Sequence, residues 1–394
     1  MARVGFIITH RNKNEWIGGY NYIRNLLQAV RDTVNVKDAI TPVIITGYSH
    51  DVTDLTNEFK GIEVIRTKLL DGRSPTWFVS RTMRKLWKRD LLLDGLLKRK
   101  RIDLISHISI GLRLRVPSVG WIPDFQHVYL PQFFDRAEID SRNRIYRDMC
   151  RYCSSIIVSS HAAAKDLEVF APDEGYKSKV LHFVAEPIKS STANADTAPP
   201  RVKYDLPERY YHLPNQYWKH KNHETVIQAL RILRASGREI SVVSTGSTSD
   251  YRHPGHFGQI TSLLRRYGLE DRFKILGVIS YEEMTAVMRN SVAVINPSLF
   301  EGWSTTVEEA KAIGKRAVLS DILVHREQNP RHSHFFDPMN PAELAEILWS
   351  LWLEEEHAGT PFAEDPERLR TDLAERKRTF GHQYRTIVEE ALHS

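Results

Sequence analysis

Apolar positions along the chain alternate between short runs rich in valine and isoleucine and longer segments with helical spacing. Runs of this length and composition are typical of buried strands in a parallel sheet. The first half contains RVGFIITH, TPVIITGY, GIEVIRT, DLISHIS, PSVGWIPD and SSIIVSS. The second half contains YYHLPN, EISVVSTG, FKILGVI, SVAVINPS, RAVLSD and SHFFDP, separated by helical segments such as HETVIQALRILRAS, ITSLLRRYG and YEEMTAVMRN. The alternation predicts the α/β class, built from βαβ units.

A polar stretch from Lys189 to Pro200, KSSTANADTAPP, interrupts this alternation and has no apolar pattern. Its composition is typical of a linker, and a chain of 394 residues is long enough for two domains. We therefore predict two Rossmann-like, doubly wound domains that face each other across a cleft. The expected boundaries are a first domain over 1–187, a linker over 188–202, a second domain over 203–365 and a helical segment over 366–394 that packs back on the first domain.

The stretch INPSLFEGWSTTVEEAKAIGKRAVLSD, residues 295–321, contains two acidic residues that flank a bend of small residues, Glu301 and Glu309. A strand before the bend, a helix from Thr306 to a C-cap at Gly314, and a second strand make a βαβ crossover. The strand-to-helix loop then lies at the carboxyl edge of the sheet, where open α/β proteins bind ligands. The free N–H groups of the helix start suit a phosphate.

A structural interpretation explains the same residues without a ligand. Thr305 with Glu308, or Thr306 with Glu309, matches the S/T-x-x-E capping box. Glu301 is then an ordinary loop carboxylate. The local spacing leaves both interpretations open.

Two further loops follow predicted strands in the same way. Gly18 and Gly19 open a helix, and paired glycines let the backbone approach a ligand closely, although a tight turn also explains them. Lys219 and Lys221 precede a helix in HLPNQYWKHKNHETV. Cations at this place neutralise a diphosphate leaving group, and a solvated basic loop is the alternative.

Three other features are less specific. Asp124 and His127 lie among aromatic residues in GWIPDFQHVYLPQFF, which suits either a sugar-binding loop or a packed structural loop. Cys150 and Cys153 form a C-x-x-C in a helical segment, without the second pair that a zinc site requires. A redox pair is the alternative to two cysteines that share one helical turn by chance.

Composition favours a soluble globular enzyme, since 41% of the residues are hydrophobic and 26% are charged. There is no run of about 18 apolar residues. MARVGFIITH enters a strand at once and lacks a small-residue cleavage site, so we expect no signal peptide and a cytoplasmic location.

The net charge of +6 is unevenly placed. Between residues 81 and 101, nine basic residues stand against Asp90 and Asp94; they are 81, 84, 85, 88, 89, 98, 99, 100 and 101. Trp77, Phe78 and further apolar residues interleave with them. The pattern favours docking of residues 77–101 on an anionic membrane, at the inner face, with a lipid-linked acceptor. A solvated helix that packs its apolar side on the core is the alternative.

Together these motifs resemble the retaining, nucleotide-sugar-dependent glycosyltransferases of family 4, which have the GT-B fold. The resemblance covers nearly the whole chain. It rests on the paired glycines after the first strand, the HKN segment, ILGVISYEEMTAVMRNSVAVINPSLFEGW, and the E-x7-E of Glu301 and Glu309. It implies transfer of a hexose from a GDP- or UDP-linked donor to a hydroxyl of a glycan or lipid-linked acceptor, with retention of anomeric configuration.

The resemblance also implies roles for individual residues. Glu301 and Lys221 would be catalytic, at the donor sugar and at the diphosphate, and Glu309 would bind the ribose. The other implied donor-binding residues are Gly18, Gly19, Lys219, Gly277, Val278, Ile279, Trp303, Ser304 and Thr305. Asp124 and His127 would line the acceptor side. We expect no metal, because the sequence has no D-x-D motif and GT-B enzymes typically work without one, and no nucleic-acid partner.

Three departures from the family pattern stand out. Gln216 occupies the place of a usual arginine, so Lys219 is a candidate for the missing charge. Ser304 stands where the family usually has a glycine, and its side chain narrows the turn. PDFQH replaces the usual histidine-aspartate pair of the first domain, which leaves the acceptor-side roles of Asp124 and His127 open.

Other functions are compatible with a two-domain architecture of this kind. An epimerase that acts on a nucleotide sugar, or a phosphorylase, could share it, because fold does not fix function. A glycoside hydrolase needs two carboxyl groups that face one bond across a defined gap, whereas the helix start suits Glu309 for a ribose. A basic protein that binds nucleic acid or glycan without turnover is the last alternative.

Overall fold

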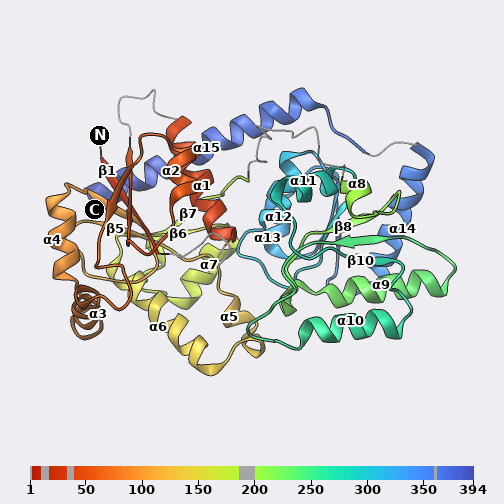
Figure 1. Cartoon of the computed structure of the whole chain (residues 1–394), viewed down its shortest axis with the longest axis horizontal. Helices are drawn as coiled ribbons and strands as arrows, with labels where there is room; N and C mark the ends of the chain where they lie inside the picture. Colours follow the sequence, from red (N-terminus) through yellow and green to blue (C-terminus); the bar gives the residue numbers. More distant parts are fainter. Residues whose placement is uncertain (1, 10–16, 33–39, 186–199, 359–361) are drawn as a thin grey trace. The chain divides into compact units, whose positions relative to one another are not determined.

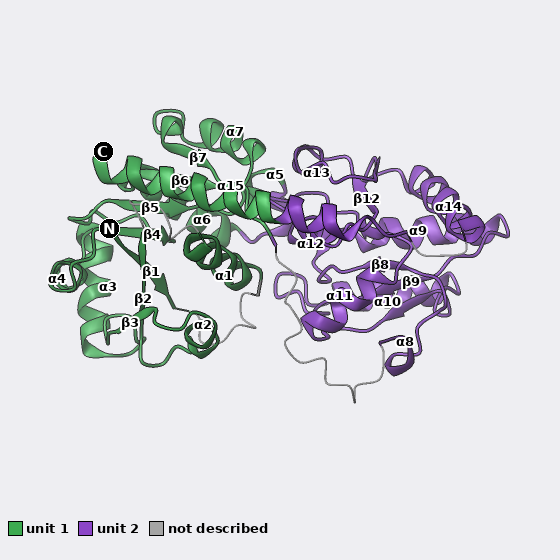
Figure 2. Ribbon diagram, turned by 90° about the horizontal axis from the view of Figure 1, so that it is seen from above, with its two compact units in different colours: residues 1–129, 136–184, 374–394 green, residues 130–135, 185–373 purple. Residues whose placement is uncertain are grey.

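Two parallel sheets organise the chain, one in each of two units (Figures 1 and 2). The computed structural model describes residues 2–9, 17–32, 40–185, 200–358 and 362–394. Unit 1 comprises residues 1–129, 136–184 and 374–394, and unit 2 comprises residues 130–135 and 185–373. The predicted linker residues 188–199 lie outside the described residues, and residues 200–202 instead begin the short helix α8 (Pro200–Lys203).

The sheet of unit 1 has seven strands in the order β3-β2-β1-β4-β5-β6-β7, and every described pair is parallel. The strands are β1 (Arg3–Ile8), β2 (Thr41–Thr46), β3 (Glu63–Arg66), β4 (Leu104–Ile108), β5 (Ser118–Trp121), β6 (Ser155–Val158) and β7 (Ser178–Val180). The first six are the predicted ones. The sequence did not predict β7, because its three residues, SKV, contain no apolar run.

Helices cover both faces of this sheet. They are α1 (Ile17–Asp32), α2 (Thr53–Glu58), α3 (Pro75–Trp87), α4 (Leu91–Arg99), α5 (Gln126–Tyr129), α6 (Arg136–Tyr152), α7 (His161–Phe170) and most of α15 (Pro366–His393). On one face α4, α6 and α7 bury their apolar residues with Ile105 and Ile156 of the sheet. On the other face α15 packs through Tyr384, whose hydroxyl donates to Ser106 Oγ at 2.7 Å. The helix expected over 366–394 is thus a single helix, and its residues 374–394 belong to unit 1.

The sheet of unit 2 has six strands, all in parallel pairs, in the order β10-β9-β8-β11-β12-β13. They are β8 (Tyr211–Leu213), β9 (Val242–Ser244), β10 (Phe273–Ile275), β11 (Val294–Asn296), β12 (Ala317–Ser320) and β13 (Ser333–Phe336). All six lie in the apolar runs that predicted them. The α/β, doubly wound prediction is confirmed for both units.

Helices also enclose the second sheet on both faces. They are α8, α9 (His223–Ala235), α10 (His256–Arg266), α11 (Tyr281–Arg289), α12 (Thr305–Ala312), α13 (Leu323–Gln328) and α14 (Pro341–Ala358). One face carries α9, α10 and α14 around a core that includes Tyr211 and Ile295. The other carries α11 and α12 around Val294 and Val307. None of the helices in the described ranges combines the length and the hydropathy required to span a bilayer.

The strand order of unit 2 reverses between β8 and β11, which are neighbours in the sheet although α9, β9, α10, β10 and α11 lie between them in the chain. The loops that follow these two strands leave the same carboxyl edge in opposite directions. In open α/β sheets a ligand binds in the crevice at such a switch point. The loops after β8 and β11 therefore define where a site in unit 2 is expected.

Candidate functional site

Lys221 and Glu301 meet at this switch point. Lys221 ends a 3₁₀ turn (Lys219–Lys221) in the loop after β8, and Glu301 lies in the loop after β11. Lys221 Nζ donates to Glu301 Oε1 at 2.5 Å. Residues 80 positions apart in the sequence are thus brought together by the strand order, and they are the two that the sequence analysis singled out as catalytic.

Backbone and side-chain hydrogen bonds hold the two loops against each other. The N–H of Leu299 donates to the carbonyl of His220 at 2.8 Å, which joins the loops directly. Thr306 Oγ1 donates to the carbonyl of Pro214 at 3.3 Å, from the first turn of α12. These bonds join groups of the protein itself, so they hold Lys221 and Glu301 in place relative to each other.

Glu301 is a carboxylate despite its burial. Its side chain is 10% exposed, and burial by itself opposes ionisation. The charge of Lys221, with hydrogen bonds from Lys221 and Ser298, outweighs burial and lowers the pKa of Glu301. The site therefore contains a mutually neutralising cation and anion.

His325 is the main residue of this site that sequence reasoning missed. It lies on α13, is fully buried, and faces Glu301 closely enough to interact with its charge. Burial lowers the pKa of His325 to about 4, so the ring is neutral at physiological pH. Its Nδ1 lies 2.9 Å from the carbonyl oxygen of Ser320, and its Nε2 has no hydrogen-bond partner within the described residues. The loop after β12 lies at the same edge of the sheet as the loop after β11. This position after a predicted strand is the sequence signal that could have identified His325.

The N-cap of α12 is Ser304, whose hydroxyl accepts a hydrogen bond from the N–H three residues on at 3.3 Å. The alternative of a capping box at Thr305 or Thr306 is therefore wrong, because the helix begins one residue earlier than the first requires and two residues earlier than the second. Glu308 is buried and instead accepts from Lys311 at 3.2 Å. Ser304 has φ −85°, so this turn does not need a glycine. The C-cap is Ile313, and Gly314, which was predicted as the cap, lies one residue further on with the left-handed φ of 65° that ends many helices.

Gln328 fixes the backbone of the turn between the two glutamates. Its Nε2 donates to the carbonyl of Ser304 at 2.9 Å, and its Oε1 accepts from the N–H of Ser304 at 3.2 Å. A phosphate at this helix start would compete with Gln328 for that N–H. The predicted phosphate and sugar contacts of Trp303, Ser304 and Thr305 remain predictions.

Glu309 differs from Glu301 in its protonation. It lies one helical turn inside α12, beside Tyr281 of α11. Burial raises the pKa of Glu309 to about 7, against a smaller opposing effect of a hydrogen bond from Tyr281. Among the residues that the structure describes, no cation offsets its burial as Lys221 does for Glu301. Glu309 therefore changes charge near neutral pH.

This difference gives a pH-dependent expectation for Glu309→Gln. The folded-state pKa of about 7 lies above the ordinary 4.5, so the folded protein binds the proton more tightly than the unfolded chain. The stability that this residue contributes is complete below about pH 4.5 and declines as the pH rises to about 7. Relative to wild type, the variant should gain on the order of 1–3 kcal/mol between pH 4 and pH 8, measured by chemical denaturation. A difference that stays constant across this range would contradict the assignment.

The loops after β9 and β10 complete the carboxyl edge of unit 2. The N–H of Gly246 donates to the carbonyl of Gly277 at 2.8 Å, which links them. Gly246 has φ 136°, and a Cβ there would lie 2.6 Å from the carbonyl oxygen of Asn215 in the loop after β8. Only glycine allows this approach. Gly277 and the exposed Val278 thus lie at the ligand edge, and their predicted contact with the nucleotide base, shared with Ile279, remains a prediction.

Residues 130–135 belong to unit 2, although the sequence placed them in the first domain. Phe133 packs under the ammonium of the exposed Lys219, at 5.5 Å from the ring centroid. Phe134 packs in the same way on Arg252, at 4.4 Å. Arg252, in the loop after β9, is a half-buried cation that sequence reasoning also missed. Whether Lys219 supplies the charge missing at Gln216 remains a prediction.

Comparison with known proteins agrees with this architecture. Residues 203–370 match the family described as "Glycosyl transferases group 1". The Anabaena protein Alr3699/HepE, solved with UDP and glucose, superposes with a TM-score of 0.69 at 15% identity, over 99% of this chain and 100% of that one. The fold is GT-B. The resemblance to GT-B glycosyltransferases predicted from the sequence is confirmed.

Other structures with the GT-B fold are similar over nearly their full length. Sucrose-phosphate synthase from Thermosynechococcus elongatus has a TM-score of 0.65 at 16% identity, over 99% of this chain and 94% of that one. A glycosyltransferase from Rickettsia africae has a TM-score of 0.63 at 16% identity, over 100% of this chain and 96% of that one. A search of the curated proteins finds no match. The group 1 match lies in the unit that contains Lys221 and Glu301.

The remaining predicted site residues belong to unit 1 of this GT-B protein. Gly18 and Gly19 lie in the first turn of α1, as predicted, and a Cβ at Gly18 would meet nothing within 4 Å. Asp124 Oδ1 accepts from a backbone N–H at the start of α5, at 2.9 Å. His127 is buried, lies 3.1 Å from Asn143 Oδ1, and has a pKa lowered by burial. These contacts match the packed structural loop that the sequence left open, and acceptor roles for Asp124 and His127 remain predictions.

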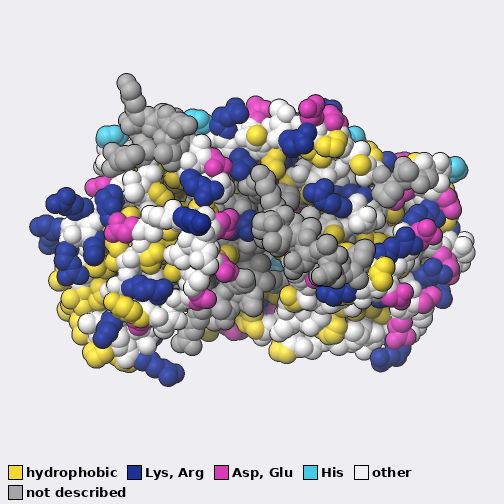
Figure 3. All heavy atoms as spheres, turned by 45° about the horizontal axis from the view of Figure 1, so that its top comes forward, with side chains coloured by type: hydrophobic (Ala, Val, Ile, Leu, Met, Phe, Trp, Pro, Cys, Tyr) yellow, Lys and Arg dark blue, Asp and Glu magenta, His cyan; other side chains and the backbone are white. Residues whose placement is uncertain are grey.

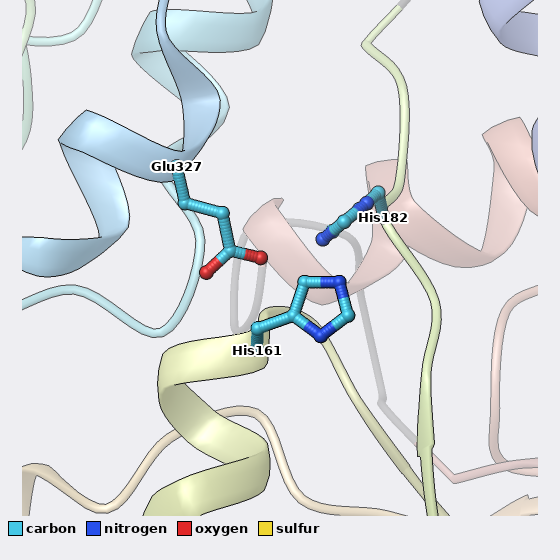
Figure 4. Close-up of side chains that lie close together, drawn as sticks. All are labelled: His161, His182 and Glu327. Atoms are coloured by element: carbon cyan, nitrogen blue, oxygen red, sulfur yellow. The ribbon is translucent and has the colours of Figure 1, made fainter.

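Two groups in unit 1 contain residue types that bind metals. Cys150 and Cys153 are buried free thiols, and burial raises their pKa values to about 12 and about 11, so neither is an activated thiolate. The rings of His161 and His182 lie 5.3 Å apart between centroids (Figure 4). Glu327, also drawn there, belongs to unit 2. The histidine pair by itself supplies two ligands, fewer than a structural zinc site needs.

Proposed function

We propose that the protein is a retaining glycosyltransferase that moves a hexose from a nucleoside-diphosphate sugar to a hydroxyl of a glycan or a lipid-linked acceptor. The observation that supports this most directly is the Lys221–Glu301 pair at the switch point of unit 2. The group 1 glycosyl transferase match covers the same unit. HepE was solved with UDP and with UDP-glucose, which favours a UDP-linked donor here.

In the proposed reaction the bond between the anomeric carbon of the donor and its phosphate oxygen breaks, and the nucleoside diphosphate leaves. The acceptor oxygen forms the new glycosidic bond on the same face of the sugar. Its proton passes to the departing phosphate oxygen. The protein forms no covalent bond, so its contribution is positioning and stabilisation of the charge that grows on the diphosphate.

The described geometry supports a division of roles. Lys221 would hold the diphosphate and stabilise its growing charge, which makes a metal unnecessary for that purpose. Glu301 keeps Lys221 neutralised before the donor binds and would then lie against the donor sugar. Glu309 would accept hydrogen bonds from the ribose hydroxyls, which a carboxylate does better than a carboxylic acid. We place the reaction in polysaccharide or lipid-linked glycan synthesis at the cytoplasmic face of a membrane.

Thermal unfolding in the presence of nucleotides tests the donor site. UDP at 100 times its Kd should stabilise the folded protein by about 2.7 kcal/mol, since it binds the native state alone. Uridine, which lacks the diphosphate, is the matched control and should stabilise much less. If UDP, GDP and the other nucleoside diphosphates all leave the unfolding temperature unchanged, a nucleotide-sugar donor is excluded. With a binding nucleotide identified, the anomeric configuration of the product determines whether transfer is retaining.

A further inference from the structure

Helix α3 turns its apolar side away from the core of unit 1. Its one fully buried side chain is Ser80, whereas Phe78, Val79 and Leu86 are exposed. At 3.6 residues per turn these three lie within an arc of about 100° on the helix. A helix of a globular protein usually turns such an arc inward. The interpretation that this segment packs its apolar side on the core is therefore wrong for α3.

The corner between α3 and α4 extends this apolar surface. Leu86 and Trp87 are 65% and 61% exposed at the end of α3, and Leu91 and Leu92 are 51% and 36% exposed at the start of α4. Single exposed apolar residues are ordinary, but a contiguous group marks an interaction surface.

Buried polar contacts hold the corner in one conformation. Asp90 caps α4 through the N–H of Leu93 at 2.9 Å and is fully buried. It also accepts from Ser80 Oγ at 2.6 Å and from Arg84 Nε at 2.7 Å, both on α3. The exposed apolar residues are thus displayed by a rigid turn.

The charge around the corner is positive. The acidic residues Asp90 and Asp94 are 0% and 7% exposed, and neither faces solvent. Arg84 is paired with Asp90, and Lys88 with Asp148 at 2.5 Å. The remaining basic residues of the segment are exposed: Arg81, Lys85, Arg89, Lys98, Arg99, Lys100 and Arg101. Figure 3 shows basic and hydrophobic side chains side by side over α3 and α4, at the left of the view.

We propose that this α3–α4 surface, residues 78–101, docks unit 1 on an anionic lipid bilayer. Aliphatic side chains and an indole ring enter the boundary between head groups and acyl chains, while flanking cations bind anionic head groups. A nucleic acid would match the charge but would leave the leucines and Trp87 in water. The bilayer satisfies both observations. The proposal does not depend on the proposed reaction.

Vesicle co-sedimentation of the full chain tests the surface. Wild type should bind vesicles of phosphatidylcholine with 30% phosphatidylglycerol and should bind pure phosphatidylcholine vesicles at least tenfold more weakly. The variant Lys85→Gln, Arg89→Gln, Lys98→Gln should bind the anionic vesicles roughly 100-fold more weakly. The variant Leu86→Ser, Trp87→Ser, Leu91→Ser should also bind the anionic vesicles at least tenfold more weakly than wild type. Arg84 and Lys88 are left intact because their ion pairs hold the fold.

Matched controls change equally exposed residues elsewhere on unit 1 and should bind like wild type. They are Arg144→Gln, Arg151→Gln, Lys165→Gln for charge, and Tyr48→Ser, Val169→Ser, Tyr176→Ser for apolar exposure. Wild-type binding by both α3–α4 variants would overturn the proposal. The proposal would also be overturned if only the charge variant lost vesicle binding and it lost heparin or DNA binding to the same extent. That result indicates that the partner is a soluble polyanion. Concentration-dependent dimerisation abolished by the apolar variant, with vesicle binding intact, would assign the surface to a second copy of the chain.

Discussion

Lys221→Ala is expected to lower the turnover number for sugar transfer by about 10²–10³-fold, the usual effect of removing a group that stabilises charge in the transition state. It should also weaken UDP binding by about 1–3 kcal/mol, since a charge-assisted contact to the diphosphate is lost. Calorimetric UDP titration and steady-state transfer measure the two effects. Arg265→Ala removes an exposed cation from α10 of the same unit, outside the predicted donor site, and is the matched control.

The interpretation requires a stability control, because Lys221→Ala leaves Glu301 partly buried without its cation. The double variant Lys221→Ala, Glu301→Gln removes that unpaired charge. It should recover stability without recovering UDP affinity, which Glu301→Gln alone should not weaken. If UDP affinity returns with stability, Lys221 is a structural residue and not a ligand of the diphosphate.

Glu301→Gln should separate catalysis from nucleotide binding. We expect the turnover number to fall at least tenfold, because a charged contact to the reacting sugar is lost. UDP affinity should stay equal or increase, since the diphosphate no longer shares Lys221 with a carboxylate 2.5 Å away. The same titration and transfer assays apply. Full turnover in Glu301→Gln, or UDP binding weakened as much as in Lys221→Ala, would show that Glu301 does not have this role.

The strands of both units other than β7 were predictable because they lie in apolar runs, and parallel strands buried on both faces leave that pattern in a sequence. The meeting of Lys221 and Glu301 was predictable for a related reason. Both follow strands, and the carboxyl ends of parallel strands share one edge. What the pattern could not give is the order of strands in the sheet, which makes β8 and β11 neighbours.

Residues whose role depends on side-chain contacts were not predictable. Gln328 and His325 reach the site from the next crossover, and no local pattern distinguishes them from ordinary helix residues. The cap at Ser304 was missed because three consecutive hydroxyl residues all match the sequence rule for a cap. The sequence also could not predict that the apolar arc of α3 faces outward. Periodicity identifies an amphipathic helix but does not say which side faces the core.

The helix α15 restricts how this protein can be divided or recombined. Its first residues belong to unit 2, and residues 374–394 cover one face of the sheet of unit 1 through Phe380, Tyr384 and Val388. A fragment that ends at the interdomain boundary near residue 187 would leave that apolar face bare and prone to aggregate. Chimeras that exchange unit 2 for that of another protein must therefore retain the native residues 374–394. Residues 374–394 complete the fold of unit 1, so each folding unit is not one continuous segment of the sequence.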